Sequence, residues 1–196
     1  LNAFPFGDFH DDRVKEAVYR PDWTTPDRIR YTVDCATVLA TLLPPDVDGS
    51  ISTVPLGFKA FGHPPAFLGA AADALVECAR AYDRIRSDTG RTIRLAVEPE
   101  PFCVLETTAE AVDFFGRLWN VADARGAGAV VREHVGVCFD VCHQAVEFED
   151  VGDAVRTLHA AGVRINKVHL SCALRLERPA TDAAGRAALA RFAEPR

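Results

Sequence analysis

The chain has 196 residues, of which 48% are hydrophobic and 26% are charged, and this ordinary composition argues against a disordered protein. The net charge of −6 argues against a nucleic-acid partner, because broad binding to nucleic acid needs a basic surface. No apolar stretch reaches the roughly 18 residues of a membrane span, and the six cysteines include no Cys-x-x-Cys pair, so we expect a cytoplasmic protein with reduced thiols.

Five segments are predicted to form strands, because each is short, rich in apolar or β-branched residues, and bounded by Gly, Pro or charge. They cover residues 1–6, 50–55, 92–98, 135–140 and 165–171. Helical patterns lie between them, at residues 25–43, 65–87, from 107 onward, 151–161 and, more weakly, 180–193. Thr25 and Pro26 are typical of a helix start, and Thr107 and Glu110 are spaced as a capping box.

Alternating strands and helices predict a parallel sheet covered by helices, either doubly wound or closed as a (β/α)8 TIM barrel. The turn after the first predicted strand lacks the G-x-G-x-x-G pattern of doubly wound nucleotide-binding proteins, which favours the barrel. A barrel has eight strands and about 250 residues. We therefore expect residues 1–196 to form a single partial barrel domain of about five βα units, and the absence of any Met leads us to expect a segment of a longer chain.

Polar side chains follow three of the predicted strands, where a barrel places its active site. Strand alternation puts Glu98 and Asp140 on the inward face, together with Lys167 and His169. His143 follows Asp140 in a D-x-x-H pattern. Carboxylate and imidazole ligands suit divalent Zn, Mn or Co, and a set richer in carboxylates suits Mg.

Other side chains near these strand ends are candidates for proton transfer or substrate binding. Glu100 is a second strand-end carboxylate, and Lys167 faces inward one layer deeper. The loop of residues 7–24 is long for a βα connection and carries His10, Tyr19 and Trp23. We interpret His10 and Trp23 as substrate-binding candidates, and Cys138 and Cys142 as packing residues.

Several motifs in chain order resemble one superfamily, the xylose isomerase-like TIM barrels, which includes sugar isomerases, sugar phosphate epimerases and endonuclease-IV-type enzymes. More closely, the motifs resemble the EboE-type metabolite traffic proteins of that superfamily. They are NAFPFGDFH, VYRPDWTTPDR, GSISTVPLGFK, VEPEP, LETTAE and GVCFDVCHQAVEFED. The resemblance covers roughly residues 1–175 and implies that further strands precede Leu1 and follow Arg196.

The resemblance also implies roles for individual residues. Glu98 matches the metal-binding Glu of the fourth superfamily strand. Asp140 and His143 match the D-x-x-H pair that follows the fifth strand, and His169 matches a ligand or substrate-binding position of the sixth strand. The last acidic ligand of the superfamily has no equivalent in residues 172–196. Glu100 stands where superfamily sugar isomerases have a Lys, which argues against a Lys-assisted mechanism.

Three functions are therefore open. The first is a metal-dependent isomerase or epimerase of a small metabolite, in which Glu98, Asp140, His143 and His169 hold the ion and His143, Glu100 and Lys167 serve catalysis. The second is a metabolite-binding or trafficking component without catalysis. The third is an endonuclease-IV-like phosphodiesterase, which the D-x-x-H pattern favours and the net charge of −6 disfavours.

Overall fold

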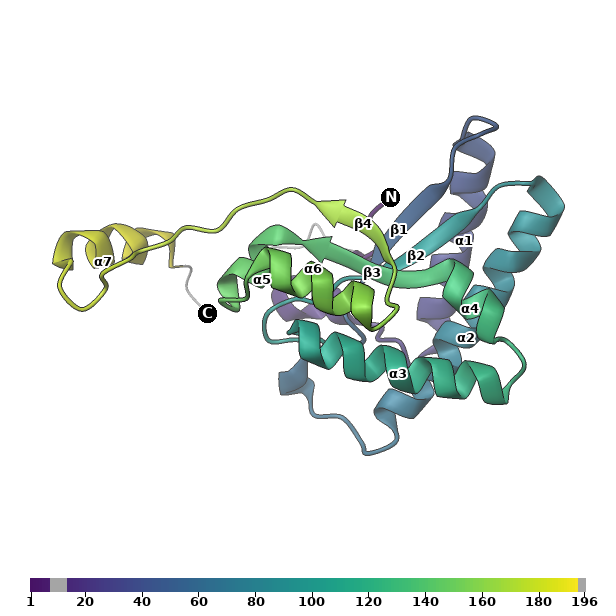
Figure 1. Ribbon diagram of the computed structural model, residues 1–196, viewed down its shortest axis with the longest axis horizontal. Helices are drawn as coiled ribbons and strands as arrows, with labels where there is room; N and C mark the ends of the chain where they lie inside the picture. The colour runs from purple at the N-terminus through teal and green to yellow at the C-terminus, as the bar shows by residue number, and fades with distance from the viewer. Residues whose placement is uncertain (8–13, 194–196) are drawn as a thin grey trace.

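The computed structural model describes residues 1–7 and 14–193. Its centre is a parallel sheet of four strands in the order β1-β2-β3-β4 (Figure 1). The strands are β1 (Gly49–Thr53), β2 (Ile93–Val97), β3 (Val135–Asp140) and β4 (Ile165–His169). All neighbouring pairs run parallel, so the four carboxyl ends meet at one edge of the sheet.

Seven α-helices occur within the described residues. They are α1 (Pro26–Leu42), α2 (Phe67–Thr89), α3 (Thr108–Ala124), α4 (Gly128–His134), α5 (Val141–Val146), α6 (Val151–Ala160) and α7 (Ala183–Leu189). Short 3-10 segments cover η1 (Lys15–Tyr19), η2 (Lys59–Phe61) and η3 (Ala190–Phe192). None of the helices in the described part of the chain is both long and apolar enough to cross a membrane.

The predicted helix ends are confirmed by their capping contacts. The Thr25 side chain accepts from the Arg28 backbone N–H, and Pro26 opens α1. Thr107 and Glu110 form the predicted capping box at the start of α3. The helix α2 ends at Gly90, which has a left-handed backbone with φ of 69° that a side chain would strain.

The predicted partial barrel of about five βα units is wrong, because the sheet has four strands. Residues 1–6 make only one bridge, between Asn2 and Ser52. Pairing stops there because the carbonyls of Ala3 and Phe4 accept from the Arg28 guanidinium, at 2.8 and 3.2 Å. The Phe4 N–H donates to the Asn2 side chain, and Pro5 has no N–H to donate.

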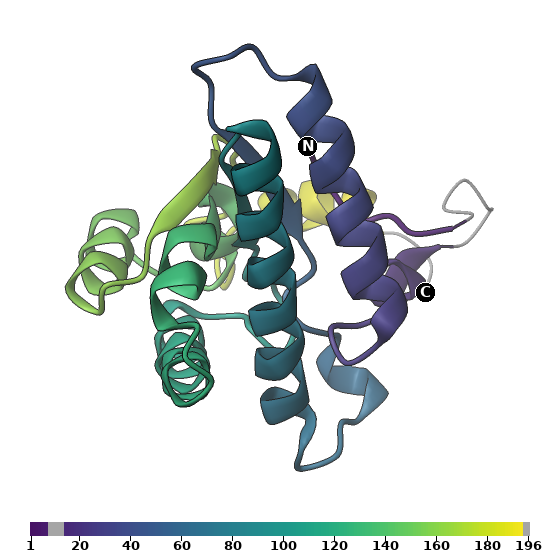
Figure 2. The same ribbon diagram turned by 90° about the vertical axis from the view of Figure 1, so that its right-hand side faces the viewer.

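The sheet is curled, and helices cover its outer face. Strand β4 contacts β1 although two strands lie between them, and the Lys167 ammonium reaches the Leu1 carbonyl oxygen. The helices α1, α2, α3 and α6 contact one another in this order along the outer face (Figure 2). Apolar side chains between helices and sheet, such as Leu75, Leu95 and Phe115, are fully or almost fully buried.

The chain after β4 leaves this layered body (Figure 1). Val168 and Leu170, at the end of β4 and just after it, are 51% and 91% exposed. The described residues after β4 form a carboxyl-terminal arm that includes α7. No residue of α7 is buried among the described residues, so α7 contributes nothing to the core.

Candidate functional site

A β-bulge sets the orientation of His169. Val137 pairs with Ile165, but the next residue of β3, Cys138, pairs with Lys167, so Asn166 is the extra residue. Asn166 lies over Gly136 and donates to the Leu95 carbonyl oxygen on β2 at 2.7 Å. Without the bulge, Val168 would oppose Asp140; with it, His169 does.

The His169 ring joins the two strand-end carboxylates. Its Nδ1 lies 3.3 Å from Oε1 of Glu98 and 3.2 Å from Oδ2 of Asp140. Because carboxylates only accept, Nδ1 carries a proton in this arrangement, or a cation takes the place of that proton. The ends of three adjacent strands thus bring two carboxylates and one imidazole together around His169 Nδ1.

Asp140 is held in place by the loop after β4. The Ser171 hydroxyl and the Cys142 backbone N–H both donate to its Oδ1, the latter at 2.9 Å. Burial raises the pKa of Asp140, but these hydrogen bonds outweigh burial and lower the pKa below its usual value. The Asp140 carboxylate is therefore charged at neutral pH, with Oδ2 directed to His169.

Glu98 is the more buried of the two carboxylates, with a side chain only 6% exposed against 9% for Asp140. Burial raises its pKa, and the neighbouring His169 and His143 lower it less than burial raises it. Its Oε2 is buried and has no hydrogen-bond partner within the described residues. An unpartnered buried carboxylate oxygen is costly unless something else binds it.

His143 lies at the edge of the cluster, in α5. Its Nδ1 is 3.0 Å from the Pro99 carbonyl oxygen and 3.7 Å from Oε1 of Glu98. Since a carbonyl oxygen only accepts, Nδ1 carries the hydrogen and Nε2 is left as the acceptor of the neutral ring. The ring is thereby fixed in one tautomer, with Nε2 available to a ligand.

The donor set fits a divalent metal ion. Two groups among the described residues could each hold one, namely Glu98 with Cys138 and His169, and Asp140 with Cys142 and His143. Nitrogen and oxygen ligands about 2.0–2.2 Å from a tetrahedral zinc ion lie about 3.3–3.6 Å apart. The distances from His169 Nδ1 to the two carboxylates, 3.3 and 3.2 Å, are close to this range.

A cavity of about 1000 Å³ adjoins the cluster. His143 and Glu100 border it on the side of the cluster, and the aromatic rings of Tyr19 and Phe58 stack with centroids 5.2 Å apart in its wall. Burial raises the pKa of Glu100, and a hydrogen bond with the Tyr19 hydroxyl lowers it less. The cavity therefore offers an aromatic wall next to carboxyl and imidazole groups.

The remaining predicted site residues lie elsewhere. Lys167 faces inward one layer below His169 and donates to the Leu1 carbonyl oxygen. Trp23 is fully buried, and its indole N–H donates to the Thr53 hydroxyl at 3.2 Å. His10 lies outside the described residues.

Two further residues were not predicted for the site. Ser171 orients Asp140, and strand alternation could have indicated it, because it shares the inward parity of His169. Phe58 reaches the cavity because its loop forms an antiparallel bridge with Cys103, a contact that leaves no local signal in the sequence.

No protein-family model matches the chain, and no curated protein matches it. Among solved structures, it is similar to the apo form of a 3-keto-D-glucoside 4-epimerase from E. coli, with 15% sequence identity and a TM-score of 0.43, over 83% of this chain and 69% of that chain. A TM-score this low establishes neither the fold nor the activity of this chain. The resemblance to the EboE-type proteins stays a prediction.

Proposed function

We propose that this chain binds a divalent metal ion at the ends of β2, β3 and β4 and acts as an isomerase or epimerase on a small polyhydroxy or carbonyl metabolite. The observation that carries the proposal is the position of His169 Nδ1, 3.3 Å from Glu98 and 3.2 Å from Asp140. The partnerless Oε2 of Glu98 is a second reason to expect a cation there.

The proposed chemistry divides between the ion and the protein. When bound, a divalent ion would supply polarisation of a carbonyl or hydroxyl group of the substrate. Glu98, Asp140 and His169 hold the ion, with His143 beside it. Nε2 of His143 accepts a proton from the substrate, because its Nδ1 is engaged with the Pro99 carbonyl oxygen.

Glu100 is the second proton-transfer group of the proposal. Its buried carboxyl borders the cavity, and its raised pKa favours the protonated form that can return a proton to carbon or oxygen. Tyr19 and Glu100 both border the cavity, and Tyr19 lowers the pKa of Glu100 less than burial raises it.

Metal binding and proton exchange test the proposal separately. Elemental analysis and calorimetric titration should find one divalent ion per chain, and Glu98→Gln should abolish its binding. Glu77→Gln is the matched control, because Glu77 is exposed on α2 and its ion pair within the described residues is with Arg80. A wild-type chain that binds no ion, or a Glu98→Gln variant that binds as well as wild type, would contradict the proposal.

Turnover is measured with the metal-loaded chain in heavy water. If His143 removes the hydrogen next to a substrate carbonyl as a proton, that hydrogen exchanges with solvent. Deuterium should then enter substrates of a panel of small aldoses, ketoses and keto acids, as read by NMR. Exchange should fall strongly in His143→Ala and Glu100→Gln.

A second candidate function is metabolite binding without turnover, as expected of an EboE-type trafficking component. The motif resemblance favours it, as does Glu100 at a position where related sugar isomerases have Lys. A metabolite that raises the unfolding temperature of the metal-loaded chain without any deuterium exchange would support this function over catalysis.

A further inference from the structure

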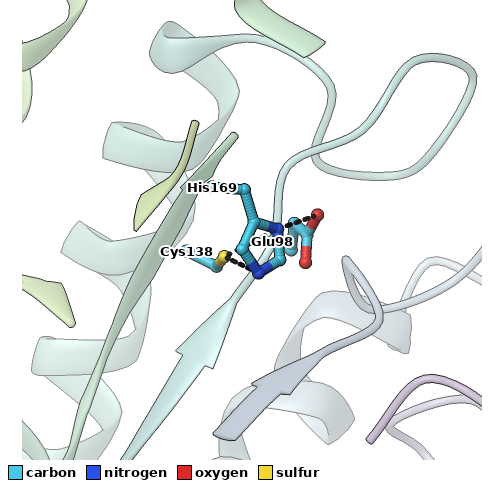
Figure 3. Close-up of side chains that lie close together, drawn as sticks. All are labelled: Glu98, Cys138 and His169. Atoms are coloured by element: carbon cyan, nitrogen blue, oxygen red, sulfur yellow. Dashed lines mark hydrogen bonds and ion pairs between the residues drawn. The ribbon is translucent and has the colours of Figure 1, made fainter. Parts of the chain in front are cut away.

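A sulfur atom lies within the candidate metal cluster. Cys138 occupies the inward position of β3 one layer below Asp140 and is fully buried. Its Sγ, one carboxylate oxygen of Glu98 and one ring nitrogen of His169 all lie within 4.8 Å of one another. Figure 3 shows the imidazole between the thiol and the carboxylate (Figure 3).

The surroundings of Cys138 differ from those of a packing cysteine. Its Sγ lies 3.7 Å from Nδ1 of His169, and it neighbours the Glu98 carboxyl, whose Oε2 is buried without a partner. A cysteine that only packs is typically surrounded by apolar atoms. Here the sulfur, the carboxylate and the imidazole come from β3, β2 and β4 and face one another.

The separations approach those of a ligand set. Sulfur and nitrogen ligands of a tetrahedral zinc ion lie about 3.5 Å apart, given bond lengths of about 2.3 and 2.0 Å. Sγ is also 3.7 Å from Nε2, so it lies against the ring, off the Nδ1 lone pair. A shared ion therefore requires the imidazole to rotate from this position, and the His169 side chain is 29% exposed.

We propose that Cys138 is a sulfur ligand of the metal site, together with Glu98 and His169, and that the site consequently takes a thiophilic divalent ion such as Zn²⁺ in preference to Mg²⁺. The inference rests on the proposed metal binding. On coordination the thiol releases its proton to solvent, and the thiolate binds the ion. Thiolate ligands select Zn²⁺, whereas a set of carboxylates and water suits Mg²⁺.

Cobalt is the probe, because a Co²⁺–thiolate bond gives a charge-transfer absorption in the near ultraviolet that nitrogen and oxygen ligands do not give. The full chain titrated with Co²⁺ should show this band, saturating at one ion per chain, and excess Mg²⁺ should not remove it. Cys138→Ser and Cys138→Ala should lose the band and bind Co²⁺ more weakly. The loss of affinity should exceed the roughly 10–100-fold that removal of an outer-shell partner costs. Circular dichroism checks that both variants are folded.

Cys142→Ser is the matched control, because Cys142 is the other cysteine among the candidate ligands of the described residues. The band should persist in this variant, which identifies Cys138 even if both Cys138 variants fail to fold. Bound Co²⁺ without the band, a band that survives in Cys138→Ala, or a band lost in Cys142→Ser would overturn the inference and leave the proposed metal binding intact. A chain that binds no Co²⁺ at all would overturn both.

Discussion

At the scale of single residues, Arg28 shows how one buried side chain can connect distant segments. Its guanidinium is fully buried and donates to the backbone carbonyls of Ala3, Phe4 and Pro21. Burial lowers the pKa of Arg28 to about 10, so it remains charged at neutral pH. The side chain thus fastens the amino-terminal segment and the loop before α1 to the helix.

We predict that Arg28→Lys destabilises the protein by about 2 kcal/mol, because an ammonium cannot reach all three carbonyls and leaves buried acceptors unpaired. Urea unfolding followed by circular dichroism measures the effect. Arg30→Lys is the control, since Arg30 lies on the same helix with a side chain 68% exposed. Equal unfolding free energies for the two variants would contradict the assigned role of Arg28.

At the scale of elements, the start of α3 depends on one carboxylate. Glu110 accepts from the backbone N–H groups of Thr107 and Glu106, at 3.0 and 2.8 Å, and from the Lys59 ammonium at 2.9 Å. Burial alone would raise the pKa of Glu110, but these donors lower it below its usual value. The charged form is thus bound more tightly in the folded state than in the unfolded state.

Because the folded pKa is lowered, Glu110 stabilises the protein above the unfolded value of about 4.3, and this contribution is lost as pH falls through the folded pKa. Glu110→Gln should cost about 1 kcal/mol at pH 7 and almost nothing at acidic pH. Asp113→Asn, an exposed position on the same helix, should show no such pH dependence. Urea unfolding at several pH values compares the two, and an equal loss for Glu110→Gln at acidic and neutral pH would refute this account.

The bulge between β3 and β4 gives a second prediction at this scale. A Cβ on Gly136 would lie 2.3 Å from the Arg164 carbonyl oxygen and 2.8 Å from Cγ of Asn166. Gly136→Ala should therefore displace Asn166, cost about 1–3 kcal/mol and weaken metal binding, because the bulge brings His169 opposite Asp140.

The control for the bulge is Gly116→Ala in the middle of α3, where a Cβ meets nothing within 4 Å. This substitution should stabilise the protein by up to about 1 kcal/mol through helix propensity and leave metal binding unchanged. Metal titration and urea unfolding of both variants separate a general cost of adding a methyl group from loss of the bulge. Unchanged metal affinity in Gly136→Ala would show that the position of His169 does not depend on the bulge.

At the scale of the whole molecule, the features that sequence predicted are those with local signals. The capped starts of α1 and α3 depend on residues within one turn. Strand alternation predicted that Glu98, Asp140 and His169 share one face, and the three side chains do meet, but His169 meets Asp140 only through the bulge. The strand predicted over residues 1–6 does not form, because the backbone carbonyls of Ala3 and Phe4 accept hydrogen bonds from the Arg28 side chain, which is distant in the sequence. The bulge likewise depends on Asn166 reaching across Gly136 to Leu95, which no local pattern encodes.

The carboxyl-terminal arm provides the last prediction. Within the described residues no side chain of α7 is buried, and Leu174 and Phe192 are 67% and 71% exposed. A chain ending at Cys172 keeps β4, His169 and Ser171, so its unfolding free energy and metal affinity should match those of the full chain within about 0.5 kcal/mol. A chain ending at Gly162 removes β4, and with it the His169 ligand and one side of the curled sheet, so it should lose both. Urea unfolding and metal titration distinguish the outcomes, and a large loss of stability on ending at Cys172 would mean that the arm contacts the body in solution.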